Sequence, residues 1–264
     1  MEIFGIQADG SQPVRLTDTD FKRNWNTAWS PDCTRLAYEA DMTGDMLVYV
    51  MDLEGGPPTA PMLDPERFYV GTYPSWSPDG QKIAFSGRME GDSTDTIFVM
   101  NADGTEPVRL TQQHPPGLDY CPSWSPDGKY LAFINTPTGA DDILTIMEPD
   151  GSNARELFTF DHPGYGCPSW SPDSRRMAIV IPGVKDAGDI AIIDTDGNGL
   201  VNLNNSEDQD WDPAWSPDGQ RIAFISQPPG GDFDVYSMNT DGSDVTALTD
   251  NTVNDHMPAW CPLP

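Results

Sequence analysis

The chain has 264 residues and a formal net charge of −28, from 14 lysine and arginine residues against 42 aspartate and glutamate residues. A surface this acidic repels phosphate backbones and anionic membranes, and nucleic-acid binding would require a basic patch that the sequence lacks. No apolar run approaches the roughly 18 residues that a membrane-spanning helix requires. We therefore expect neither nucleic-acid binding nor membrane insertion.

A tryptophan-containing tetrapeptide recurs along the chain. Trp-Ser-Pro-Asp begins at Trp29, Trp76, Trp124, Trp170 and Trp215, and a degenerate sixth copy begins at Trp260. The intervals between these tryptophans are 47, 48, 46, 45 and 45 residues, a period typical of a four-stranded propeller blade. The repeat predicts an all-β fold, a six-bladed β-propeller of mostly four-stranded antiparallel blades that spans residues 1–264 as a single domain.

The first predicted element in chain order is half a blade. Residues 2–17 contain a short apolar segment, an Asp-Gly turn at Asp9 and an Arg-Leu-Thr segment, which correspond to the third and fourth strands of the units that follow. An apolar second strand is missing from this half blade.

Five complete units follow, each with the same order of strands and turns. A first strand ends in Trp-Ser, and a Pro-Asp-Gly turn, whose glycine tolerates a positive φ angle, leads into an apolar second strand. An Asp-Gly turn, a strong hairpin signal, separates the third strand from a last strand that carries Leu-Thr. The second strands are expected at 36–38, 83–85, 131–133, 177–179 and 222–224, and third strands at 96–100, 143–147, 189–193 and 235–238. No stretch shows sustained 3.6-residue periodicity, so we expect almost no helix.

The C-terminal residues are predicted to supply a further strand of the blade that residues 2–17 begin. Residues 257–264 contain only a first strand, and together with residues 1–17 they are predicted to form a seam blade closed by both termini. Because the second strand is missing, this seam blade is predicted to be three-stranded. Closure of the ring removes the exposed sheet edges that an open arc would leave.

The repeated unit resembles the TolB-like β-propeller repeat, which reads Trp-Ser-Pro-Asp-Gly, Ile-Ala-Phe, Ile-Tyr-Val-Met-Asn, Asp-Gly-Ser and Leu-Thr. Residues 74–111 match this pattern almost throughout, and the resemblance covers essentially the whole chain. It implies a six-bladed propeller, a periplasmic or secreted location and a use in protein–protein contacts. The first residues show no leader for secretion, so the resemblance alone carries the expected location. Because the motif is structural, it predicts the fold more specifically than the function.

The positions just before each tryptophan vary while the frame around them repeats. Repeat proteins tend to place function where the units differ, on one face, so we expect a binding site at the loops that lead into the first strands. The positions five, four and three residues before each tryptophan supply the candidate ligand-binding residues Asn24, Trp25, Asn26, Tyr73, Asp119, Tyr120, Tyr165, Asp210, Trp211, Asp212, Asp255 and His256.

These candidates combine carboxylates with aromatic rings. Carboxylates that converge on the propeller axis suit a hard cation such as calcium, and the candidate metal ligands are Asp119, Asp210, Asp212 and Asp255. Aromatic rings beside them suit a cationic side chain or the face of a sugar. The alternative is a water-filled funnel in which the aromatic rings only pack the loops. No cofactor other than calcium is expected.

The repeated residues of the frame are interpreted as structural. The aspartate of each tetrapeptide, such as Asp79, is expected to accept backbone hydrogen bonds in its turn, and the tryptophan is expected to pack between blades. The aspartate before each third strand, such as Asp142, is interpreted as a local loop anchor.

The four cysteines form two candidate pairs. Cys121 and Cys167 occupy equivalent positions in neighbouring blades, and Cys33 and Cys261 lie in the first blade and the seam blade. A disulfide requires Cα atoms within about 7 Å, which adjacent inner strands need not satisfy. We expect two free, mostly buried pairs, with a bridge in either pair as the alternative.

Three hypotheses for function follow. The first is a non-enzymatic protein-interaction or scaffold propeller, a monomer that binds a protein or peptide partner, of basic character, at the funnel face. The second is a calcium-dependent carbohydrate-binding propeller. The third is a metal-dependent lyase or hydrolase that uses His256 with nearby aspartates. We favour the first because Gly-x-Ser-x-Gly, His-Glu-x-x-His and a phosphate-binding glycine loop are all absent from the sequence.

Overall fold

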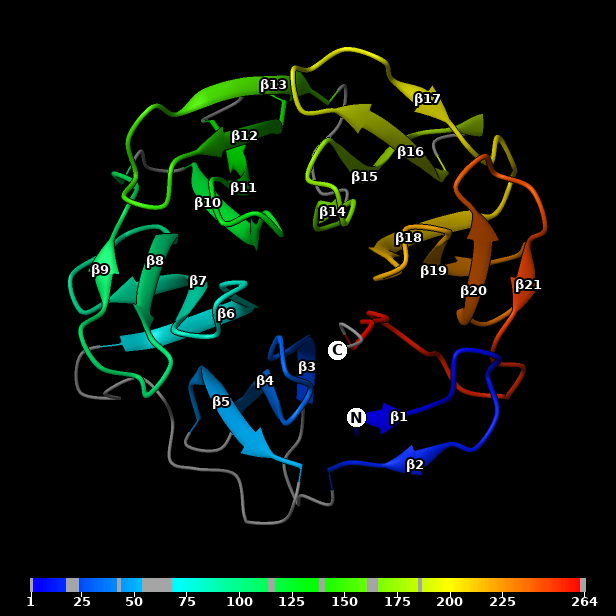
Figure 1. Ribbon diagram of the computed structural model, residues 1–264, viewed down its shortest axis with the longest axis horizontal. Coiled ribbons are helices and arrows are strands. Elements are labelled where there is room, and N and C mark those ends of the chain that lie inside the picture. The colour runs from blue at the N-terminus through cyan, green and yellow to red at the C-terminus, as the bar shows by residue number, and fades with distance from the viewer. Residues whose placement is uncertain are drawn as a thin grey trace.

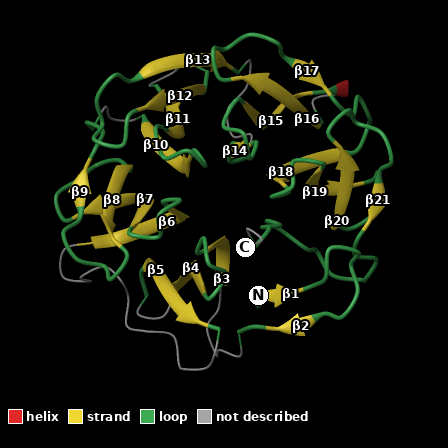
Figure 2. Ribbon diagram, viewed as in Figure 1, coloured by secondary structure: helices red, strands yellow, loops and turns green. Residues whose placement is uncertain are grey.

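The structure is a computed structural model that describes residues 2–17, 24–41, 44–53, 68–113, 117–137, 141–160, 166–184 and 187–261. The described residues form β-sheets arranged in a ring around a central axis, with the first strand of each sheet innermost (Figure 1). Helix is confined, among these residues, to a single 3₁₀ position at Val184 (Figure 2). None of them belongs to a helix long and apolar enough to span a bilayer. The predicted all-β class is confirmed.

Three of the sheets each contain four antiparallel strands in chain order. They comprise β10 (Leu118–Trp124), β11 (Leu131–Thr136), β12 (Ile143–Met147) and β13 (Arg155–Thr159); β14 (Ser169–Trp170), β15 (Arg176–Pro182), β16 (Gly188–Asp194) and β17 (Val201–Asn202); and β18 (Gln209–Trp215), β19 (Arg221–Gln227), β20 (Asp234–Asn239) and β21 (Thr246–Ala247). Their second and third strands lie where the apolar segments of the repeat predict them.

A larger sheet contains the first two repeat units. Its strands are β3 (Asn24–Trp29), β4 (Arg35–Asp41), β5 (Met46–Asp52), β6 (Phe68–Trp76), β7 (Lys82–Met89), β8 (Thr96–Asn101) and β9 (Val108–Arg109). One parallel pair, Met46 with Val70, joins β5 to β6, and every other pairing in this sheet is antiparallel. Residues 54–67, between β5 and β6, lie outside the described part.

The N-terminal hairpin and the C-terminal segment lie in the same gap of the ring (Figure 1). β1 (Phe4–Gly5) pairs with β2 (Val14–Arg15) in a separate antiparallel hairpin. Figure 1 places this hairpin and the C-terminal segment between the sheet that begins with β3 and the sheet that ends with β21. Residues 257–261 contain no assigned strand, and residues 262–264 lie outside the described part.

The middle strands of each sheet carry the hydrophobic core. Large side chains such as Tyr38 on β4, Phe85 on β7 and Phe224 on β19 are buried, because each sheet packs against a neighbour on both faces. The outermost strands differ: Val108 and Val201 are 57% and 55% exposed. Burial therefore falls from the second and third strands towards the rim of the ring.

The repeated tetrapeptide forms a turn held by its own serine and aspartate. In the second unit, the Ser77 hydroxyl donates to Asp79 at 2.6 Å and accepts from the amide of Lys82 at 2.9 Å. The amide of Gln81 donates to the same carboxylate at 3.0 Å. The other four units repeat these bonds. The predicted role of these aspartates as turn acceptors is confirmed.

The repeated tryptophans connect neighbouring units, as predicted. The indole nitrogen of Trp76 donates to the carbonyl of Ala28 at 3.1 Å, and that of Trp170 donates to the carbonyl of Ser123 at 3.0 Å. In both cases the acceptor is the residue just before the tryptophan of the preceding unit. Each such bond therefore fixes the distance between two inner strands.

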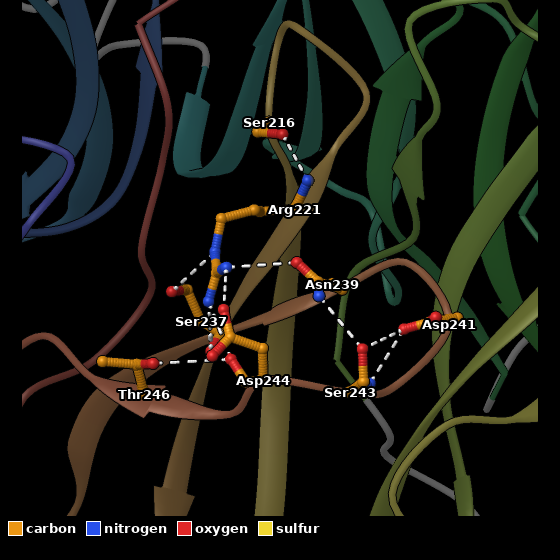
Figure 3. A network of polar contacts seen from close by, with 8 residues as sticks. All are labelled: Ser216, Arg221, Ser237, Asn239, Asp241, Ser243, Asp244 and Thr246. Atoms are coloured by element: carbon orange, nitrogen blue, oxygen red, sulfur yellow. Dashed lines mark hydrogen bonds and ion pairs between the residues drawn. The ribbon is translucent and has the colours of Figure 1, made fainter.

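Arg221 connects several segments of the fifth unit near its Asp-Gly turn (Figure 3). The amide of Arg221 donates to Ser216, and its guanidinium donates to Ser237, Asn239 and Asp244. One side chain thus joins the second strand of this unit to its third strand and to the loop before its fourth strand.

Two tryptophans that differ in one hydrogen bond test its contribution to stability. Trp76 and Trp215 are each 6% exposed, and an arginine lies over each ring, Arg35 at 4.5 Å and Arg176 at 5.0 Å. The indole nitrogen of Trp215, unlike that of Trp76, has no acceptor among the described residues. We expect Trp76→Phe to lower the free energy of unfolding by about 1 kcal/mol more than Trp215→Phe, measured by urea denaturation. Equal losses would show that the bond contributes nothing.

Candidate functional site

The inner strands bend at the same position in most of the units. Three residues before the repeated tryptophan, Asn26, Tyr73, Cys121, Asp212 and Met257 adopt positive φ angles between 46° and 56°. The pairing register shifts at this position in β3, β6, β10 and β18. Such a β-bulge leaves one residue out of the ladder and redirects its side chain. The bulge therefore turns these side chains away from their own sheets.

The redirected residues contact one another across sheet boundaries. The amide of Asn26 donates to the Met257 sulfur at 3.3 Å, and the amide of Met257 donates to the Asp212 carboxylate. Cys121 is bonded to Cys167. We call Asn26, Tyr73, Cys121, Cys167, Asp212 and Met257 the inner ring. Its members come from every repeat unit and from the C-terminal segment.

Both cysteine pairs form disulfides, so the expectation of free thiols is wrong. The Cα atoms are 5.0 Å apart in Cys121–Cys167 and 5.7 Å apart in Cys33–Cys261. Both distances lie within the range that a disulfide spans. The prediction failed because the backbone of Cys121 is left-handed at the bulge, which directs its side chain towards the neighbouring inner strand.

Every inner-ring residue except Asn26 borders a cavity of about 630 Å³ at the centre of the molecule. Aromatic rings form much of its wall: Tyr73, Tyr120, Trp211, Phe233 and His256. The rings of Tyr73 and Tyr120 lie 6.0 Å apart, and those of Phe233 and His256 lie 5.8 Å apart. The Cys121–Cys167 disulfide, Met257, Leu118 and Ile225 add apolar surface to the lining.

Three carboxylates line the same cavity, in three different settings. Asp95 pairs with the Arg88 guanidinium at 2.7 Å. Asp142 accepts from the Tyr120 hydroxyl at 2.8 Å and from the Thr136 hydroxyl at 2.6 Å. Asp212 accepts the amide of Met257, and burial raises the pKa of its carboxyl to about 6. The described lining includes no lysine or arginine, so the cavity is aromatic and acidic.

Five of the predicted site residues line this cavity. Tyr73, Tyr120, Trp211, Asp212 and His256 come from three of the repeat units and the C-terminal segment. Trp25 lies close to them, because its ring stacks on that of His256 with centroids 6.3 Å apart. Tyr165 lies outside the described residues.

The remaining described candidates are not part of this lining. Asp119 accepts from Asn135 at 2.7 Å, Asp210 accepts from Asn204 at 2.7 Å, and Asp255 accepts from Asn251 at 2.7 Å. Asn24 is 2% exposed, and Asn26 donates to Glu39.

The four candidate metal ligands do not come together. In the part of the chain that the structure describes, no three histidine, cysteine, aspartate or glutamate side chains are grouped as metal ligands. Instead, Asp119, Asp210 and Asp255 each accept from an asparagine of their own unit or its adjoining loop, and Asp212 alone lines the cavity. Calcium binding by these residues stays a prediction.

Sequence reasoning missed a buried acid beside the inner ring. Glu39 on β4 is 3% exposed and accepts from the side-chain amide of Asn26 and from the backbone amide of Tyr73, and burial raises its pKa to about 8. The signal was present, because Glu39 follows Leu-Ala-Tyr where other units have serine, isoleucine or valine after the same apolar triplet. Asp142 and Phe233 were also missed as lining residues, because they lie between second and third strands.

Glu39 makes stability depend on pH. The folded chain holds this proton more tightly than the unfolded chain, so stability falls as the pH rises from 4.5, the ordinary pKa, to about 8. We expect Glu39→Gln, which keeps the acceptor oxygen, to be more stable than the wild type by about 3 kcal/mol at pH 8 and little changed at pH 4.5. Urea denaturation at both pH values measures this. The exposed Glu90→Gln serves as the control, and an equal pH response of both variants would refute the assignment.

Comparison with known proteins agrees with this geometry. The sequence pattern of the TolB beta propeller domain matches residues 65–165 and 152–263. No curated protein matches the chain by sequence. The structure is similar to that of a putative TolB from Agrobacterium tumefaciens, with 25% identity and a TM-score of 0.81 over 99% of this chain and 93% of that one.

Two further solved structures share the fold at lower identity. TolB from Acinetobacter baumannii is 23% identical with a TM-score of 0.79 over 97% of this chain, which spans only 61% of that protein. An oligogalacturonate lyase in complex with manganese is 18% identical with a TM-score of 0.62, over 94% of this chain and 72% of that one. Because the matching pattern covers more than half of the sequence, the chain belongs to the TolB beta propeller domain family.

Proposed function

We propose that this protein is a non-enzymatic interaction propeller that binds a protein or peptide partner at the central cavity. One observation carries the proposal: the cavity of about 630 Å³ is lined by five aromatic side chains and three carboxylates. Aromatic residues at the centre of a concave surface are the typical anchors of protein interfaces. The cavity residues also differ from unit to unit, whereas the turns of the frame repeat.

The charge of the chain supports a basic partner. The net charge of −28 and the acidic lining attract a positively charged segment and raise its rate of association. Such attraction between exposed charges is screened by salt. The affinity for the partner therefore falls as ionic strength rises.

We also propose that the chain ends close the ring as a sixth, seam blade. Three contacts support this. Trp260 donates to the carbonyl of Ala214 at 3.0 Å and Trp29 donates to that of Ala259 at 3.3 Å, as other tryptophans of the repeat do. The Cys33–Cys261 disulfide then links the two sides covalently.

The N-terminal hairpin contacts the fifth unit as the other hairpins contact their neighbours. A Cβ atom at Gly10 would collide with the carbonyl oxygen of Leu248, just as one at Gly242 would collide with that of Leu203. Both glycines follow the aspartate of an Asp-Gly turn, and both leucines belong to the last strand of a unit or to the segment just after it. The hairpin of residues 2–17 thus occupies the position of a blade.

Closure predicts unequal contributions from the two disulfides. Cys33–Cys261 spans 228 residues and Cys121–Cys167 spans 46, so the former restricts the unfolded chain more. We expect Cys33→Ser/Cys261→Ser to lose about 1.4 kcal/mol more unfolding free energy than Cys121→Ser/Cys167→Ser, if loop entropy dominates. Denaturant unfolding under oxidising conditions measures both losses. A larger loss of unfolding free energy for the Cys121–Cys167 variant would contradict this expectation.

The disulfides also support a location outside the cytoplasm. Disulfides persist in oxidising compartments and are rare where thioredoxin and glutathione keep thiols reduced. The described residues contain no free cysteine. We propose a periplasmic or secreted protein. The carbohydrate-binding and lyase hypotheses gain no support from a specific contact in this structure.

Site-directed photo-crosslinking tests the binding face. A benzophenone amino acid replaces Trp211 at the cavity in one variant and Val201, on the exposed strand β17, in another. In cells that produce the protein, we expect crosslinks to one partner from position 211 and none to it from position 201. With that partner purified, Trp211→Ala is expected to weaken binding at least about tenfold, and Val201→Ala to leave it unchanged.

Two results would contradict the proposed binding face. If the partner crosslinks from the rim at position 201, or if Trp211→Ala binds it with unchanged affinity, the central cavity is not the interaction face. Calorimetric titration with each variant gives the affinities, and circular dichroism confirms that both variants are folded.

A further inference from the structure

We propose that the cavity receives one positively charged side chain of the partner, a lysine or an arginine, with Asp212 as its counter-ion. This inference rests on the proposed function and specifies what the cavity recognises. The ligand chemistry is an ammonium or guanidinium group at the end of an aliphatic chain, carried on a peptide. Three observations lead to it.

The first observation is the charge balance of the lining. Of the three carboxylates, Asp95 is already paired with Arg88, and Asp142 is occupied by two hydroxyl donors. Asp212 accepts a backbone amide and pairs with no basic side chain among the described residues. A half-buried carboxylate without a cation is costly, and a cation from outside relieves that cost. One positive charge neutralises one such carboxylate.

The second observation is that Asp212 is left accessible from the fourth unit. Gly166 lies four residues before Trp170, where the other units and the C-terminal segment have Trp25, Thr72, Tyr120, Trp211 and His256. A Cβ atom placed on Gly166 would lie 3.4 Å from the Oδ1 atom of Asp212. The absence of a side chain at this one position therefore keeps the carboxylate open to the cavity.

The third observation is the aromatic wall around this carboxylate. Tyr73 lies near it: burial, then the charges of Glu39 and Asp212, raise the pKa of the Tyr73 phenol to about 12. Tyr120 packs beside Tyr73, and Trp211 precedes Asp212 in the chain. Aromatic faces attract cations and cover their aliphatic stems, and planar guanidinium groups stack on them. An anionic or neutral group gains no such cation–π attraction.

Short peptides test the charge requirement with the full chain. The probes are three acetylated, amidated pentapeptides of sequence Gly-Gly-X-Gly-Gly, in which X is arginine, lysine or citrulline. Citrulline has the shape of arginine without its charge. At pH 7.5 we expect the arginine or lysine peptide to bind at least about tenfold more tightly than the citrulline peptide, measured by titration of the tryptophan indole NMR signals.

Two variants assign the effect to the carboxylate. Asp212→Asn is expected to remove the difference between the charged and neutral peptides. Asp250→Asn, which changes the net charge equally at an exposed position outside the cavity, is expected to keep it. Gly166→Ala is expected to weaken binding of the charged peptide about tenfold, because the added methyl group covers Asp212. Thermal unfolding of each variant separates lost binding from lost folding.

The peptide titrations either support or overturn the role of Asp212 as the counter-ion. Preferential binding of a charged peptide that Asp212→Asn abolishes and Asp250→Asn retains supports the inference. Equal binding of the citrulline peptide, an unchanged preference in Asp212→Asn, or no binding of either charged peptide at millimolar concentration overturns it. The crosslinking experiment at position 211 uses none of these peptides. A partner found there whose binding ignores Asp212→Asn would leave the proposed function standing and this inference refuted.

Discussion

The left-handed bulge on the inner strands is the constraint on which the central cavity depends. It occurs three residues before the repeated tryptophan, where an ordinary strand would keep its side chain in the ladder. A non-glycine residue with positive φ is uncommon, and it persists only where the surrounding structure holds it. Here the contacts that hold it come from neighbouring units: a disulfide for Cys121 and a backbone amide for the carboxylate of Asp212. The same geometry that links the units therefore also exposes their variable residues to the cavity.

Two kinds of acidic residue follow from this architecture. Aspartates in the turns of the frame accept local hydrogen bonds, and the pKa of Asp32 is lowered to about 2, chiefly by the Ser30 hydroxyl. Acids near the inner ring, Glu39 and Asp212, are instead buried with few donors, and their pKa values are raised. Perturbed carboxyls beside a cavity are typical of functional sites, whereas turn acceptors serve the fold. The turn aspartates and the two acids at the inner ring therefore shift in opposite directions within one strongly acidic chain.

Much of the fold could be predicted from the sequence, because each unit repeats its local signals. The tetrapeptide turn, the apolar second strand and the Asp-Gly hairpin are all local features, and the structure places them as predicted. The site was predicted only in part. Tyr120 and Asp119 are adjacent in one strand, yet one lines the cavity and the other is bonded to Asn135 within its sheet. The bulge after Tyr120 and the two-residue alternation of side chains along the strand determine which of the two residues faces the cavity. Neither the position of the bulge nor the alternation follows from the residue types alone. The two cysteine pairs were identified, but for the same reason their thiols were wrongly expected to be free.

The buried acids also explain why the inner ring needs such strong connections. A carboxyl taken out of water without a cation favours unfolding at neutral pH, and the chain carries Glu39 in the middle of an otherwise apolar strand. Local rules of sequence are broken in this region, by an acid in a core strand and by non-glycine residues in left-handed backbone. Proteins tolerate such violations mainly where function requires them, and stabilise the surroundings to compensate. The indole hydrogen bonds between units and the Cys121–Cys167 and Cys33–Cys261 disulfides supply that compensation. The inner ring therefore combines these violations with the cavity at which we propose that a partner binds.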